Sequence, residues 1–169
     1  TFTSLAQWVP SGPDFHEDVL HALLVSAAFH AEQRLLLATP YYVPDESMQN
    51  ALCSSAYRGV DTTIILPARN DSWIVGGASR SYYANLLNAG VAIYEYVGGL
   101  LHTKSLTVDG EVALIGSANM DRRSFELNYE NNILLYDAKL TAELRKRQRE
   151  YLSRSNAVTR EMVASWPVS

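Results

Sequence analysis

Three short apolar runs, separated by segments with helical periodicity, constrain the fold of this chain more than any other feature. The run Leu-Leu-Leu-Ala at residues 35–38 has no alternating polar position, and the runs at 60–66 and 91–96 are rich in β-branched or aromatic residues. Such runs are typical of strands that are buried on both faces. The helices predicted around these strands begin near Asp14, Asp45 and Ser72 and end near Gln33, Gly59 and Ala89.

Strands cluster in the second part of the chain. Residues 103–108 and 112–115 predict two short strands joined by a tight hairpin at Asp109-Gly110. The remaining predicted elements are strands at residues 5–9 and 128–136, a helix from Asp137 to about Ser153, and a short helix from Thr159. With no repeat or linker, the chain is predicted to be one α/β domain over residues 1–169. Its sheet is expected to be mixed, with helices on both faces.

Composition narrows the classes of function. The chain has 169 residues, is 47% hydrophobic and carries a net charge of -4, whereas a nucleic-acid-binding domain is usually basic. Cys53 is the sole cysteine, so an internal disulfide is excluded and a reducing compartment fits. Neither a spanning apolar segment nor a signal peptide is visible. Because the chain starts at Thr1 on a strand-like run, we expect it to be a piece of a longer protein, and we expect this piece itself to be soluble.

One polar motif indicates chemistry: His102-x-Lys104-x-x-x-x-Asp109. Residues two apart in a strand point to the same face, so His102 and Lys104 are predicted to project together. Random placement of the chain's His, Lys and Asp residues would give this spacing with an expectation of roughly 0.003. The pair would set a nucleophile or proton carrier beside a fixed positive charge.

The residues that follow the hairpin support this prediction. Gly116 permits close backbone approach, and Ser117 and Asn119 supply hydroxyl and amide groups for phosphate oxygens. Glu130 supplies a carboxylate that, by accepting from one ring nitrogen, would fix the tautomer of a histidine. Attack on a phosphodiester needs a neutral imidazole nitrogen, with donors for the developing negative charge.

These motifs resemble those of the phospholipase D superfamily, whose signature is His-x-Lys-x4-Asp followed by Gly-Ser-x-Asn. The resemblance is closer to the C-terminal half of bacterial cardiolipin synthases and runs from about Trp8 to Tyr151. It is carried by the segments at residues 9–14, 39–45, 79–83, 93–96 and 121–125.

The resemblance implies phosphatidyl transfer, such as cardiolipin synthesis from phosphatidylglycerol, through a phosphohistidine intermediate. Neither a metal nor another cofactor is implied. Lys104 and Asn119 would bind phosphate, Ser117 would assist, and Glu130 would orient His102. Asp109 belongs to the catalytic motif, but its place at the hairpin indicates that it shapes the turn.

Family enzymes pair two such motifs, and this chain has one. The resemblance therefore implies a partner, either a missing N-terminal half or a second copy, and leaves open whether His102 is nucleophile or general acid. It also implies a phospholipid substrate and work at the surface of the bacterial inner membrane, on the cytoplasmic side. Two alternatives stay open: a homodimeric nuclease, and an isolated half-domain that binds phosphate headgroups without activity.

Other polar residues have simpler interpretations. His16, His21 and His30 share no helix face, so metal binding is not expected. The basic run at residues 145–149 suggests a solvated helix face supported by a Glu143–Arg147 pair, or contact with anionic lipid headgroups. Tyr41 and Tyr42 follow a strand end, where they would line a substrate cleft or belong to the core.

Overall fold

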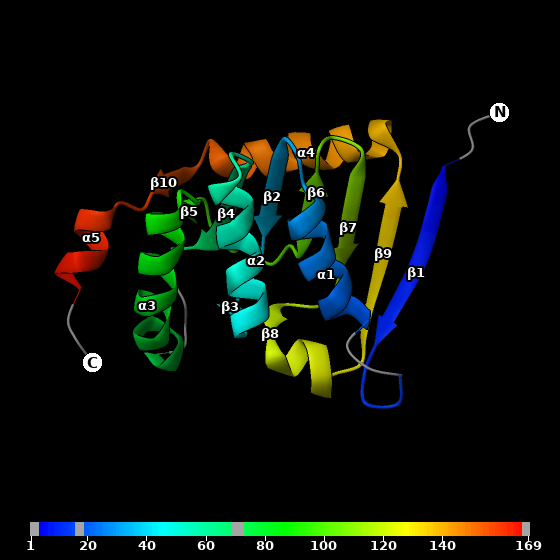
Figure 1. The fold of residues 1–169 in the computed structure, drawn as a ribbon, viewed down its shortest axis with the longest axis horizontal. Helices are drawn as coiled ribbons and strands as arrows, with labels where there is room; N and C mark the ends of the chain where they lie inside the picture. Colours follow the sequence, from blue (N-terminus) through cyan, green and yellow to red (C-terminus); the bar gives the residue numbers. More distant parts are fainter. Residues whose placement is uncertain (1–3, 16–18, 69–72, 167–169) are drawn as a thin grey trace.

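The computed structural model describes residues 4–15, 19–68 and 73–166, with side chains in the last range from residue 81 onward. Within these ranges, eight strands form one mixed sheet (Figure 1). In spatial order they are β1 (Leu5–Ser11), β9 (Glu130–Tyr136), β7 (Val112–Gly116), β6 (Ser105–Val108), β2 (Arg34–Ala38), β4 (Asp61–Pro67), β5 (Ala92–Tyr96) and β10 (Ser155–Ala157).

The sheet has a parallel part and an antiparallel part. Strands β2, β4 and β5 are parallel, and every other neighbouring pair is antiparallel. The helices are α1 (Val19–His30), α2 (Glu46–Tyr57), α3 (Trp73–Ala89), α4 (Ala138–Leu152) and α5 (Arg160–Ser165). Figure 1 shows α1, α2 and α3 in front of the sheet and α4 crossing the strands behind it. The predicted α/β architecture, with helices on both faces, is confirmed.

The packing of strand β2 (Arg34–Ala38) explains why residues 35–38 are apolar without alternation. Leu35 and Leu37 belong to the large core beneath α1 and α2, whereas Leu36 and Ala38 pack on the α4 side with Tyr151. Because side chains alternate between the faces of a strand, a strand covered on both faces favours apolar residues at every position.

Three helix starts match their predicted caps. Asp45 accepts from the Met48 N–H, Asp137 accepts from the Leu140 N–H, and Thr159 accepts from the Met162 N–H. Each oxygen satisfies an N–H group that the first turn of the helix leaves free.

The predicted start of the first helix is wrong. Asp14 and Phe15 are not helical, helix α1 is described from Val19 onward, and the Asp14 carboxylate accepts a hydrogen bond from the Tyr129 hydroxyl. Its proposed capping partner Glu17 lies outside the described residues. The helix also ends at His30, before the predicted end at Gln33.

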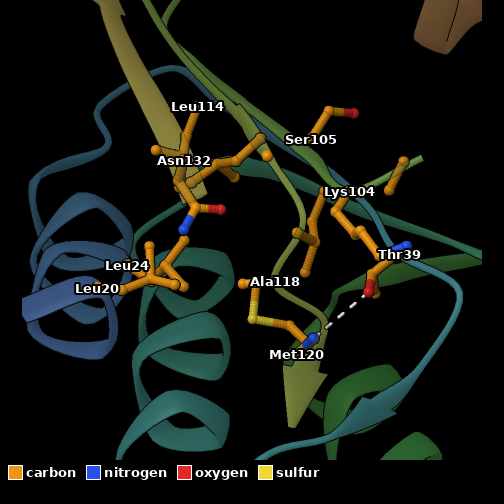
Figure 2. A pocket seen from close by; sticks show the side chains of 13 residues that line it. Leu20, Leu24, Thr39, Lys104, Ser105, Leu114, Ala118, Met120 and Asn132 are labelled. Atoms are coloured by element: carbon orange, nitrogen blue, oxygen red, sulfur yellow. Dashed lines mark hydrogen bonds between the residues drawn. The ribbon is translucent and has the colours of Figure 1, made fainter. Parts of the chain in front are cut away.

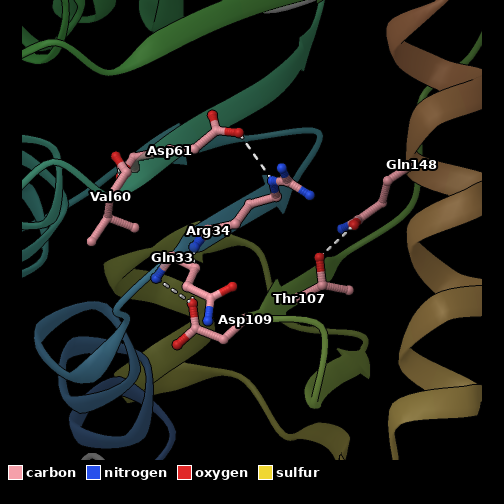
Figure 3. Close-up of polar contacts among 8 residues, drawn as sticks. Gln33, Arg34, Val60, Asp61, Thr107, Asp109 and Gln148 are labelled. Atoms are coloured by element: carbon pink, nitrogen blue, oxygen red, sulfur yellow. Dashed lines mark hydrogen bonds and ion pairs between the residues drawn. The ribbon is translucent and has the colours of Figure 1, made fainter.

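Asp109 joins the hairpin between β6 and β7 to the loop that enters β2 (Figure 3). It adopts φ 53° and Gly110 φ 74°, as the predicted tight turn requires. Its carboxylate accepts hydrogen bonds of 2.8–2.9 Å from the backbone N–H groups of Glu32, Gln33 and Arg34. The predicted turn-shaping role of Asp109 is therefore also an anchoring role.

Gln148 fixes α4 to the other side of the same strands (Figure 3). Its buried side-chain amide accepts from the Thr107 hydroxyl at 2.8 Å and donates to the Leu36 carbonyl at 3.1 Å. Since a buried amide is costly without partners, these bonds specify one position of α4 across β6 and β2.

We expect Asp109→Asn to lower the free energy of unfolding by about 1–2 kcal/mol, because a neutral amide accepts more weakly than a carboxylate. Asparagine tolerates the positive φ, so the change tests the charge and not the turn. Urea unfolding measures the effect. Glu111→Gln, an equal charge change on the same exposed hairpin, is the control and should stay within about 0.5 kcal/mol of wild type. Equal effects of the two variants would contradict the anchoring role.

The Asp109 anchor also predicts a pH dependence. Burial raises the pKa of the Asp109 carboxyl, but three backbone hydrogen bonds together outweigh burial and hold the pKa below its ordinary 3.8. A lowered pKa in the folded state stabilises the fold above the unfolded-state pKa, and the contribution is lost as pH falls through the folded pKa. The difference in unfolding free energy between wild type and Asp109→Asn should be constant above about pH 5 and shrink below about pH 4. A gap that widens with acid would contradict this.

Candidate active site

The predicted site residues, apart from Asp109, gather where β6 begins, β7 ends and β9 begins. The Gly116 N–H donates to the Lys104 carbonyl at 3.2 Å, and Gly116 is the register partner of Asn132. The Ser117 N–H donates to the Asn131 carbonyl at 3.0 Å. Backbone pairing across three neighbouring strands thus places these residues in adjacent rows at one end of the sheet.

His102 and Lys104 do not lie in a strand, which corrects the prediction that residues 103–108 form one. Strand β6 begins at Ser105, the register partner of Ala38. The next residues of the β2 segment, Thr39 and Pro40, leave the sheet, and a proline has no N–H to donate. The segment that carries His102 therefore lacks a strand partner on that side.

The lysine of the motif turns back toward the histidine. The Lys104 Nζ donates to the His102 backbone carbonyl at 3.0 Å. Partial burial lowers the pKa of the Lys104 ammonium, and the negative charge of Glu130 partly offsets that effect. The His102 side chain is exposed, and no hydrogen bond joins its imidazole to any residue that the structure describes.

Gly116 confirms the predicted close approach. A Cβ atom at this position would lie 2.5 Å from the Asn131 carbonyl oxygen and closer still to the Asn132 side-chain oxygen. Any larger residue would displace β9, which carries Glu130. The glycine therefore sets the spacing between two walls of the site.

Glu130 and Ser117 form a pair. The Ser117 hydroxyl donates a short hydrogen bond to the Glu130 carboxylate, and the Asn128 amide donates to the same carboxylate at 3.4 Å. The structure thus gives Glu130 hydroxyl and amide partners, and among the described side chains no hydrogen bond joins it to His102. That Glu130 orients His102 stays a prediction.

Asn119 is held by a turn that sequence patterns did not indicate. Its N–H donates to the Ser124 hydroxyl at 3.1 Å, and Ser124 lies in a single π-helical turn, η1 (Arg123–Leu127). Such turns are frequent at functional sites. The buried Asn119 side-chain oxygen has no partner within the described residues, which is costly unless another group supplies a donor.

A small cavity of about 20 Å³ lies beneath the site (Figure 2). Lys104, Thr39 and Asn132 are among its polar lining residues, and Leu20 and Leu24 of α1 close it. Thr39 and Asn132 were not singled out from the sequence, although both are almost fully buried. A signal for Asn132 existed: it stands two positions after Glu130 and thus on the same strand face.

The structure separates several other candidates from the site. Asp109 lies at the far end of β6, roughly 17 Å along the strand from Lys104. Tyr42 is a core residue whose hydroxyl donates to Gln49 at 2.8 Å, whereas Tyr41 is partly exposed. His21 contacts Asp45 at 3.0 Å.

The remaining histidines lie apart from the site as well. His30 contacts the Ser26 carbonyl in its own helix, and His16 lies outside the described residues. In the part of the chain that the structure describes, no cluster of three or more His, Cys, Asp or Glu side chains is arranged to hold a metal ion. Of the helices in these ranges, none combines the length and apolar composition of a membrane-spanning segment.

Two solved structures share the fold. Nuc, a phospholipase D family member from Salmonella typhimurium, superimposes with a TM-score of 0.78 at 21% identity, covering 92% of this chain and 99% of that one. Phosphatidylserine synthase from Haemophilus influenzae Rd KW20 has a TM-score of 0.72 at 16% identity, covering 91% of this chain and 40% of that one. At these identities the likeness shows the fold alone.

Sequence relatives are closer. Cardiolipin synthase A from Klebsiella pneumoniae is 49% identical over 147 residues, and that from Citrobacter koseri is 46% identical over 160 residues. These matches cover 87% and 95% of this chain but only 30% and 33% of the relatives, so the chain spans about a third of their length. The family model described as "Cardiolipin synthase, PLD-like domain" matches residues 24–151, and the chain therefore belongs to this family.

Proposed function

We propose that residues 1–169 form one phospholipase D-like catalytic half-domain and supply one of two histidine-lysine motifs for phosphatidyl transfer. The substrate would be phosphatidylglycerol, and the product of transfer to a second lipid would be cardiolipin. The observation that carries the proposal is the convergence of Lys104, Ser117, Asn119 and Glu130 around the segment of the exposed His102.

The proposed reaction is a double displacement at phosphorus. One histidine nitrogen attacks the phosphodiester and forms a P–N bond while the P–O bond to the leaving alcohol breaks. The second histidine gives that alcohol its proton. An acceptor alcohol, deprotonated by the same group, then attacks phosphorus and releases the first histidine. His102 would be either the nucleophile or the proton donor, because an imidazole can act in both roles.

The neighbours of His102 suit the charge that develops in this reaction. The Lys104 ammonium would stabilise phosphate oxygens, and desolvation makes such a contact stronger than in water. The side-chain NH2 group of Asn119 would donate to a further phosphate oxygen. Since the unpaired buried atom is the amide oxygen, the amide would have to turn on binding to place its NH2 group there. The Glu130 carboxylate would hold the Ser117 hydroxyl in one orientation.

The second histidine has to come from another half-domain. The curated relatives are about three times as long as this chain, which leaves room for such a half and for membrane attachment. We place the reaction at the cytoplasmic side of a bacterial inner membrane, where both lipid substrates reside. Partner half, substrate and location are all parts of the proposal.

His102→Ala in the longer protein should lower phosphatidyl transfer by about 10²–10⁴-fold, the range for loss of a proton-transferring or nucleophilic group. The assay is conversion of labelled phosphatidylglycerol in detergent micelles. His30→Ala, which removes a histidine from the surface of α1, is the matched control and should leave the rate unchanged. Undiminished transfer by His102→Ala would contradict the assignment. Mass spectrometry of the rapidly quenched protein would locate the phosphatidyl group on His102 if it is the nucleophile.

Gly116→Ala should reduce transfer by more than about tenfold and lower the free energy of unfolding by about 1–3 kcal/mol, because the new methyl group meets β9. Combining it with Asn132→Ala removes the nearer obstacle, so the double variant should regain part of the stability. A double-mutant cycle in urea measures this coupling. Additive effects would show that Gly116 does not set the distance between β7 and β9.

A second function is favoured by one observation. Nuc has nearly the same extent as this chain, so a domain of this size is a complete chain in that family member. If two copies of this chain pair, two motifs would meet in a homodimeric phosphodiesterase. Light scattering of the 169-residue chain, with an assay on single-stranded DNA, tests this. An inert monomer would exclude it and favour the half-site.

A further inference from the structure

A second cationic pocket lies at the opposite end of the sheet from His102. It has a volume of about 210 Å³, and its polar lining comes from Arg34 of β2, Asp61 and Thr63 of β4, and Arg145 and Arg149 of α4. We call it the arginine pocket. It begins at the first residues of β2 and β4, whereas the candidate active site adjoins the ends of β2 and β7.

The register of the sheet explains why these residues meet. Arg34 pairs with Asp61, and Leu36 pairs with Thr63, in the parallel ladder between β2 and β4. Alternate residues share a face, and Leu36 packs toward α4, so this row points to α4 as well. On the helix, Arg145 and Arg149 are four residues apart and therefore lie one above the other. Strands β2 and β4 thus form the floor of the pocket, and one face of α4 covers it.

The arginine pocket has more positive than negative charge. Arg34 forms a salt bridge of 3.0 Å with Asp61, and Figure 3 shows its guanidinium on the side where α4 lies. Arg145 and Arg149 have no ion pair or side-chain hydrogen bond with any residue in the described ranges. Like charges at this helical spacing cost stability, and the chain as a whole is acidic.

A neighbouring arginine shows that α4 does pair its charges elsewhere. Arg147, on another face of the helix, contacts Glu150 at 2.6 Å and lies over the Tyr151 ring. The predicted Glu143–Arg147 pair is therefore replaced by an Arg147–Glu150 pair. The unpaired arginines are confined to the face that lines the pocket, where one carboxylate offsets three guanidinium groups.

We propose that the arginine pocket binds a phosphate-class anion, either a soluble phosphate or phosphomonoester or the phosphate of a lipid headgroup. Guanidinium groups present two parallel N–H donors that match phosphate oxygens, and they stay charged at all physiological pH values. Arg145 and Arg149 would clamp the anion, Thr63 would offer its hydroxyl from the floor, and Arg34 would add a third cation beside Asp61. This site is separate from the proposed catalytic function and does not depend on it.

The test is isothermal titration of the 169-residue chain with inorganic phosphate, in a Lys104→Gln background that removes the phosphate ligand of the candidate active site. Arg145→Gln and Arg149→Gln should each weaken binding by at least about tenfold, as loss of a charge-assisted hydrogen bond predicts. Lys146→Gln removes one exposed charge from the same helix outside the pocket and should change the affinity less than about twofold. Arg149→Lys, which keeps the charge but not the paired donors, should fall between.

Absence of phosphate binding in the Lys104→Gln background would overturn the proposal. So would equal weakening by Lys146→Gln and Arg149→Gln, which would indicate attraction to the net charge of α4 alone. Circular dichroism of each variant separates loss of the site from loss of the fold. Two further arms identify the source of the phosphate: titration with glycerol 3-phosphate, and flotation with phosphatidylglycerol vesicles. If Arg149→Gln weakens only the binding of glycerol 3-phosphate, the ligand is a soluble phosphate. If it weakens only the binding to vesicles, the ligand is a lipid headgroup.

Discussion

The hydrogen bonds that the Asp109 carboxylate accepts from three consecutive backbone N–H groups hold together the two parts of this sheet. Strand β2 has a parallel partner on one side and the antiparallel strand β6 on the other, so the sheet changes from parallel to antiparallel pairing at this junction, as it does again between β5 and β10. Asp109 fixes the junction at one end. Gln148 fixes it from the α4 face, through partners on both strands.

The candidate active site depends on this junction. Lys104 directly precedes β6, and Gly116 ends the neighbouring strand β7, so any slip of β6 against β2 would move both. The spacing between His102 and Asp109 thus has a physical meaning within one chain. Strand β6 has the candidate site residues next to one of its ends and the Asp109 anchor next to the other. Asp109, which the motif groups with the candidate catalytic residues, has a structural role here.

Sequence patterns predicted the features that arise from local physics. Alternation, capping and turn chemistry are properties of a few adjacent residues, which is why β2, the Asp45 cap and the Asp109-Gly110 turn were foreseen. The errors arose where distant segments compete for the same group. Asp14 could cap a helix, but Tyr129, far along the chain, takes its carboxylate. Glu130 bonds to Ser117, and its role toward His102 stays a prediction.

The position of His102 could not be predicted for a related reason. Extension of β6 to this residue needs a strand partner beyond Ala38, and no local pattern reports where a neighbouring strand leaves the sheet. Asn132 and the arginine pocket have the same origin. Both are products of register, which brings together side chains from separate elements and only becomes visible when the strands are paired.

The edge position of β1 has a consequence for how the chain acquires this structure. Within the described residues its neighbour in the sheet is β9, with Leu5 opposite Tyr136, so β1 pairs with a strand that follows it far along the chain. Pairing over such a separation carries a large loop-closure cost and is slow. Until β9 emerges from the ribosome, Leu5 and Trp8 stand on an unpaired strand, which is the state in which edge strands associate with the wrong partner. Pairing of β1 and formation of the Glu130 side of the candidate site therefore both wait for β9.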